Sequence, residues 1–130
     1  MSHLRELAAS GGLDDFGAPQ NWVANAAVRH TLQTAIEALI DVAYHVAAKR
    51  LKAAPTDGYH AFSLLVGAGC IPPPLLPTVR RMVGFRNRIV HRYIDIEDAE
   101  VLHIVLQDLG DFETVLQALE TAVRSTPSSL

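Results

Sequence analysis

Residues 19 to 52, PQNWVANAAVRHTLQTAIEALIDVAYHVAAKRLK, decide the fold of this chain of 130 residues. Pro19 suits the first position of a helix, where its missing N–H leaves no helical hydrogen bond unmade. Apolar side chains then recur at intervals of three and four residues, which predicts one long amphipathic helix that forms the spine of the fold. We expect its buried stripe to contain Trp22, Val23, Ala26, Ile36, Leu39, Ile40, Ala43 and Ala47.

Proline and glycine divide the next part of the chain into shorter helices. The stretch 55 to 58, PTDG, is a break in which Thr56 or Asp57 can cap a second helix, from Tyr59 to about Val66. The triproline at 72 to 74 then begins a third helix, because the amides of a first helical turn have few partners to lose.

A fourth helix completes the predicted fold. Asp95 can cap it, and apolar side chains recur at three and four residues from Val101 to Val123. The chain contains no strand pattern and no hairpin turn, so the sequence predicts an all-α protein, an up-and-down antiparallel bundle of about four main helices. We expect a poorly structured segment at 1–18 with at most one short helix, a helical domain at 19–124 and a loose tail at 125–130.

The predicted third helix contains a cationic cluster, RNRIVHRY, at residues 86 to 93. At about 100° per residue, Arg86 falls in the middle of an otherwise apolar face. A guanidinium in that position must pair with a carboxylate, face a partner subunit or receive an anionic ligand such as phosphate, since an isolated buried charge is very costly. The apolar residues of this face are Met82, Val83, Ile89, Val90 and Tyr93.

Three polar residues beside Arg86 favour a reactive site. Asn87 and His91 are one helical turn apart, and Tyr93 lies two turns beyond Arg86, so we expect all four side chains to converge on one patch. Histidine exchanges protons near neutral pH, and arginine binds phosphate, which together suit phosphoryl transfer on RNA. The simpler alternative is that Arg86 forms an ion pair within the chain and His91 is a cation favoured at a helix C-terminus.

The charge is distributed unevenly. The formal net charge is −3, which argues against a surface that binds nucleic acid over its whole extent. Five of the eleven basic residues nevertheless lie in one short stretch, which predicts a local anion-attracting patch where Arg81, Arg88 and Arg92 bind RNA. The alternative for each of these arginines is a solvated helix face. The full set of five is Arg80, Arg81, Arg86, Arg88 and Arg92.

The stretch FRNRIVHRYID, residues 85 to 95, resembles the Arg-x4-His signature of HEPN-domain ribonucleases, in the Arg-x4-His-x-Tyr form of the HepT toxin family. The resemblance extends over residues 20 to 120 and includes the helix LQTAIEALIDVAYH at 32 to 45 and the Pro-x-x-x-Tyr stretch from Pro55 to Tyr59. A longer N-terminal helix is usual in the family, so residues 1–18 depart from its pattern.

The resemblance implies a homodimeric toxin, a metal-independent endoribonuclease that cleaves mRNA or tRNA. Arg86 and His91 would be its catalytic residues at the dimer interface, with Asn87 in support. Tyr93 would accept AMP from a nucleotidyltransferase antitoxin of the MntA type, and this modification would block RNA entry. One alternative within the family is a catalytically weak HEPN partner that mainly binds the nucleotidyltransferase. A purely structural dimerisation protein would leave Arg86 unexplained.

The dimer also follows from the chemistry. One histidine cannot be acid and base at once, whereas a two-fold axis would bring two copies of His91 and Arg86 into one cleft. We therefore expect a dimer seam lined by Met82, Val83, Ile89 and Val90.

No cofactor is expected. Glu37, Asp41 and His45 follow one another at one-turn spacing, but a third ligand at a recognisable spacing is missing, so we expect no metal. Cys70 is the only cysteine, no secretory signal is evident, and no apolar run reaches the length of a membrane span. These features predict a cytoplasmic protein with no membrane association.

Overall fold

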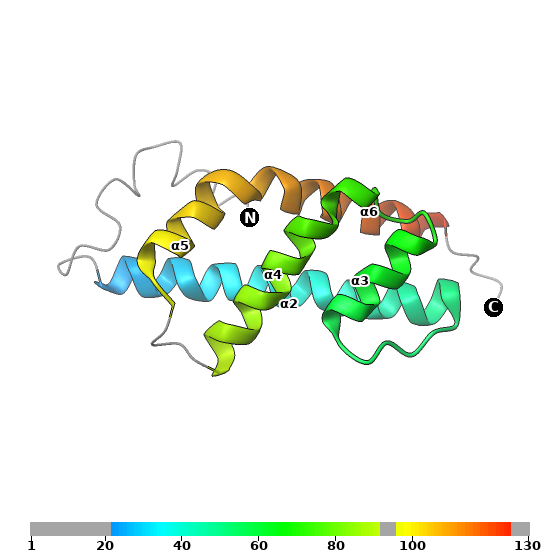
Figure 1. Ribbon diagram of the computed structural model, residues 1–130, viewed down its shortest axis with the longest axis horizontal. Helices are drawn as coiled ribbons and strands as arrows, with labels where there is room; N and C mark the ends of the chain where they lie inside the picture. Colours follow the sequence, from blue (N-terminus) through cyan, green and yellow to red (C-terminus); the bar gives the residue numbers. More distant parts are fainter. Residues whose placement is uncertain (1–21, 92–95, 126–130) are drawn as a thin grey trace.

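The computed structural model describes residues 22–91 and 96–125 (Figure 1). The described regular elements are all helical, which confirms the predicted all-α class. They are α2 (Trp22–Leu51), α3 (Gly58–Gly67), a 3₁₀ turn η2 (Pro73–Leu75), α4 (Leu76–His91), α5 (Asp98–His103), a π-helical segment η4 (Ile104–Asp108) and α6 (Leu109–Ser125). The predictions for residues 1–18, for Pro19, for the cap at Asp95 and for residues 126–130 fall outside the described residues.

Helix α4 lies across the centre of the fold. In Figure 1, α2 and the α5–η4–α6 stretch extend in the same direction along the molecule, and α4 runs back between them. Helix α2 contacts α3, α4 and α6, and α4 also contacts α3 and α6. The four main helices of the prediction are therefore α2, α3, α4 and the combined α5–α6 stretch. None of the described helices is both long enough and apolar enough to span a membrane.

The spine helix is confirmed, but its buried stripe begins later than predicted. Ile36, Leu39, Ala43 and Ala47 are buried, and Ile40 is half-buried. Val23 is 60% exposed and Ala26 is also exposed, so these two core assignments were wrong. Among the described residues the core contribution of α2 starts at Val28, the turn at which α5 is attached through Arg29. Periodicity identifies the apolar side of a helix but not the length over which other helices cover it.

The predicted start signals of the two middle helices are confirmed. Asp57 is the N-cap of α3, and its Oδ1 accepts a hydrogen bond of 2.7 Å from the backbone N–H of His60. The triproline leads into η2, after which α4 accommodates Pro77 in its first turn. These proline positions cost no helical hydrogen bond, because the first amides of a helix have no acceptor within it.

The last helical stretch differs in one respect from the predicted uniform helix. The segment Ile104–Asp108 is π-helical and places the carboxylate of Asp108 in the interior, with the residue 4% exposed. Near the end of α6, Leu119 and Ala122 are buried. Val123 follows Ala122 by about 100° around the helix and is 41% exposed, so its inclusion in the buried stripe was wrong.

Candidate functional site

Helix α4 separates an apolar side from a polar one. Val79, Met82, Phe85 and Ile89 are each at most 3% exposed and anchor the helix in the bundle. The opposite side is exposed and contains Arg80, Asn87, Arg88 and His91. The helix thus holds its polar residues on a rigid, well-packed element, as a binding or catalytic site requires.

Arg86 lies at the boundary between these two sides. Its Nε is 3.5 Å from Oε1 of Glu37 on α2, and the two side chains are 35% and 36% exposed. The same carboxylate oxygen accepts a hydrogen bond of 2.9 Å from Nε2 of Gln33. The Nε atom of Arg86 is itself buried and has no hydrogen-bond partner within the described residues. Of the options that the sequence left open for Arg86, an ion pair within the chain is therefore present, and the guanidinium still reaches solvent.

Asn87 is connected to Arg86 and directs the site toward solvent. Nη1 of Arg86 donates a hydrogen bond of 3.2 Å to Oδ1 of Asn87. His91 follows Asn87 by one turn and is exposed at the C-terminus of α4. Arg86 and His91 are five residues apart, so they leave the helix about 140° apart. Arg86 and Asn87 are thus brought together as predicted, whereas His91 of the same chain faces another direction.

The predicted dimer seam needs correction. Met82, Val83 and Ile89 are 1%, 6% and 3% exposed within a single chain, because they pack in the core of the bundle. They cannot also line a surface that meets a second subunit. Val90, with 44% of its surface exposed, is the one member of the predicted seam that remains available.

The other arginines of the cationic cluster have partners within the chain. Arg81 contacts Oδ1 of Asp108 at 3.3 Å, and Arg88 forms an ion pair with Glu100. Three of the arginines on α4 therefore face carboxylates from three different elements, and the patch is more nearly neutral than the sequence indicated. Arg80 donates a hydrogen bond to the hydroxyl of Tyr59 and lies over its ring. Arg92 and Tyr93 fall outside the described residues.

Sequence reasoning missed the carboxylates that organise these arginines. Glu37 entered only as a metal ligand beside Asp41, although Gln33 at the preceding turn was a local signal for a hydrogen-bonded pair on α2. For Glu100 the sequence offered no signal beyond its charge. No group of three metal-ligating side chains occurs in the parts of the chain that the structure describes.

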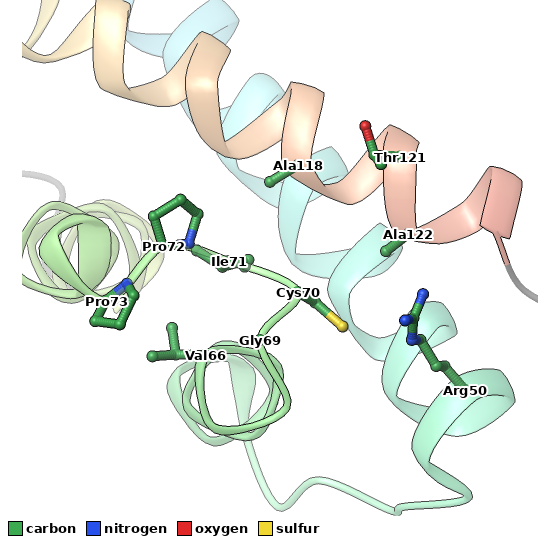
Figure 2. Close-up of a pocket in the computed structure, with 10 residues that line it drawn as sticks. All are labelled: Arg50, Val66, Gly69, Cys70, Ile71, Pro72, Pro73, Ala118, Thr121 and Ala122. Atoms are coloured by element: carbon green, nitrogen blue, oxygen red, sulfur yellow. The ribbon is translucent and has the colours of Figure 1, made fainter.

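A separate pocket of about 430 Å³ lies at the other end of the bundle (Figure 2). It is formed where the α3–η2 connection meets the C-terminal ends of α2 and α6, and it contains Arg50 and the thiol of Cys70. It includes no residue of α4, so it does not belong to the site around Arg86 and His91.

Comparisons with known proteins agree with this geometry. Residues 1–119 match the family model described as "Ribonuclease HepT-like". The chain is 34% identical over 89 residues to the mRNA nuclease HepT of Shewanella oneidensis, which corresponds to 68% of this chain and 67% of that protein. It also superimposes on a chain from a crystal structure of a toxin–antitoxin with AMP-PNP, with a TM-score of 0.75 and 28% identity over 89% of this chain and 86% of that one. The chain belongs to the HepT-like ribonuclease family.

Proposed function

We propose that this protein is the toxin of a toxin–antitoxin pair and cleaves RNA, with mRNA as its substrate class, through Arg86 and His91. The observation that carries the proposal is the arrangement on α4. A guanidinium held between Glu37 and Asn87 can bind a phosphate, and an exposed histidine lies on the same helix. The similarity to an mRNA nuclease and to a toxin–antitoxin structure supports this assignment. Such a toxin would act in the cytoplasm, where mRNA is translated.

The chemistry assigns a role to each residue. The ribose 2′-hydroxyl loses a proton as it attacks phosphorus, and the leaving 5′-oxygen gains one. His91 transfers these protons, Arg86 stabilises the added negative charge on the phosphorus-bound oxygens, and Asn87 supports Arg86 through their hydrogen bond. Arg81, Arg88 and Arg92 would hold the flanking phosphates.

A homodimer completes the site in this proposal. Since Arg86 and His91 of one chain diverge by about 140° around α4, a second copy related by a two-fold axis supplies the His91 that faces the first copy's Arg86. Two copies of His91 would then serve as acid and base. Val90 is exposed and lies beside His91 in the sequence, so it is placed to contribute apolar contact at such an interface.

Regulation by AMP completes the proposal. Tyr93 follows His91 by two residues, and a nucleotidyltransferase antitoxin of the MntA type would attach AMP to its hydroxyl. The added phosphate and nucleotide would compete with RNA for the arginines of α4, which places the modification where it can block entry.

A second candidate function is a catalytically weak subunit that mainly binds the nucleotidyltransferase. It is favoured by one observation, the carboxylate of Glu37 already beside Arg86, since this contact reduces the positive charge offered to RNA.

One experiment separates the two. Purified protein is incubated with mRNA in the presence of EDTA, alongside the Arg86→Ala and His91→Ala variants. Cleavage by the native protein that both variants lose, with folding retained by circular dichroism, supports the ribonuclease. Retained cleavage in both variants removes the site assignment, and no cleavage by the native protein favours the binding subunit.

A further inference from the structure

Arg88 on α4 and Glu100 on α5 form a two-point ion pair. Nη1 of Arg88 donates a hydrogen bond of 3.0 Å to Oε2 of Glu100, and Nη2 donates to Oε1. The two side chains are 47% and 32% exposed, so the pair lies at the surface and is accessible to a ligand. Both donors are arranged in the fork that arginine presents to any planar pair of oxygens.

The pair is next to the proposed catalytic histidine. Arg88 directly follows Asn87 and precedes His91 by three residues, a spacing that brings two side chains onto neighbouring positions of a helix surface. All three residues are exposed. An anion held by Arg88 would therefore lie beside His91 on the outer face of α4.

A carboxylate and a phosphate diester use the same donors of an arginine. We propose that Arg88 binds a phosphate of the RNA strand beside His91, and that Glu100 sets the affinity by occupying the same two N–H groups until RNA displaces it. This inference rests on the proposed RNA cleavage and adds the residue that controls substrate binding. Glu100 thereby lowers the affinity for RNA and makes binding depend on a strand that can replace both of its oxygens.

The attachment of α5 does not depend on this pair. Arg29 of α2 is 8% exposed and donates hydrogen bonds to the carbonyl of Ile96 at 2.9 Å and to Oδ1 of Asp98 at 2.6 Å. Val101 on α5 is fully buried. Exposed ion pairs of the Arg88–Glu100 kind contribute little to stability. Glu100 can therefore leave Arg88 without releasing the helix, which is the behaviour that exchange with phosphate requires.

The test measures binding of a single-stranded, fully 2′-O-methylated RNA, which lacks the attacking hydroxyl, by fluorescence anisotropy at several salt concentrations. Glu100→Gln removes the competing charge, so we expect affinity to rise about threefold to tenfold and the salt dependence to steepen by about 0.7 in log–log slope, the value for one additional phosphate contact on a single strand. Arg88→Ala is expected to weaken binding and to reduce the slope by a similar amount.

Two comparisons make the test specific. Glu97→Gln removes the same charge from an exposed position three residues earlier and is expected to leave the affinity within twofold. Glu100→Gln introduced together with Arg88→Ala is expected to bind as Arg88→Ala alone, because the competition has lost its object.

Equal effects of Glu100→Gln and Glu97→Gln would overturn the inference, as would an unchanged gain in the absence of Arg88. If the native protein cleaves RNA while Glu100→Gln binds no tighter, the inference fails and the proposed function stands. If the native protein neither cleaves nor binds RNA, the proposed function fails first and the inference fails with it.

Discussion

The Nε atom of Arg86 lies 3.5 Å from Oε1 of Glu37, and this contact fixes the central guanidinium of α4 against α2. Gln33 holds the carboxylate from the preceding turn, at 2.9 Å, and Asn87 accepts a hydrogen bond from Nη1 of the arginine. Arg86 is thus oriented from two sides before any ligand arrives. Preorganised cations of this kind stabilise developing charge without a reorganisation cost at the moment of reaction.

Loss of the Glu37 charge should reduce catalysis more than substrate binding. We expect Glu37→Gln to lower kcat for RNA cleavage about fivefold, which corresponds to roughly 1 kcal/mol of lost orientation, while KM stays the same or falls because Arg86 carries less compensating charge. Steady-state cleavage of a fluorogenic RNA separates the two parameters. Asp41→Asn, an exposed residue one turn further along α2, is the matched control and should change neither. A rise in kcat for Glu37→Gln would show that Glu37 restrains Arg86 instead of orienting it.

Val90 should report on the proposed homodimer. A lysine at this position would bring two like charges together across a two-fold axis while leaving the attraction for RNA intact. We expect Val90→Lys to halve the mass measured by light scattering and to lower RNA cleavage at least tenfold. Val123→Lys, at a similarly exposed position on α6, should retain both the mass and the activity. A monomeric native protein that cleaves RNA would contradict the composite site.

Arg29 should contribute substantially to stability. It is 8% exposed and joins α2 to both Ile96 and Asp98. Removing it leaves a buried carbonyl and a half-exposed carboxylate without their donor, so we expect Arg29→Ala to lower the free energy of unfolding by about 2 kcal/mol. Urea denaturation followed by circular dichroism measures the change, and His30→Ala at the adjacent exposed position is the control. A double-mutant cycle with Asp98→Ala should yield a coupling energy of about 1 kcal/mol or more; additivity would deny the pair any role.

Tyr93 should determine sensitivity to the antitoxin. Incubation with the cognate nucleotidyltransferase and ATP is expected to add the mass of AMP to the native protein and to stop RNA cleavage. Tyr93→Phe lacks the acceptor hydroxyl, so it should retain its mass and remain active under the same conditions. Peptide mapping by mass spectrometry locates the modification, and Tyr59→Phe is the control for another tyrosine. Addition of AMP to Tyr93→Phe would place the acceptor elsewhere.

The helices could be predicted because the interactions that start and continue them are local. The cap of α3 at Asp57 and the proline-led start of α4 follow from residues within one turn, and the apolar repeats identified the core positions Ile36, Leu39 and Phe112. The errors came where local pattern and tertiary cover differ, as at Val23 and Val123.

The cationic cluster and its phosphate-binding chemistry were likewise determined by the sequence, since residue type fixes charge, donor geometry and proton exchange. The partners of each arginine were decided only by the tertiary structure. Glu37 reaches Arg86 from α2, and Glu100 reaches Arg88 from α5, because packing of the bundle places these helices against α4. Packing also turned Met82 and Ile89 inward, which removed them from the predicted seam. A helical repeat specifies which residues share a face, but only the packed bundle specifies what that face meets.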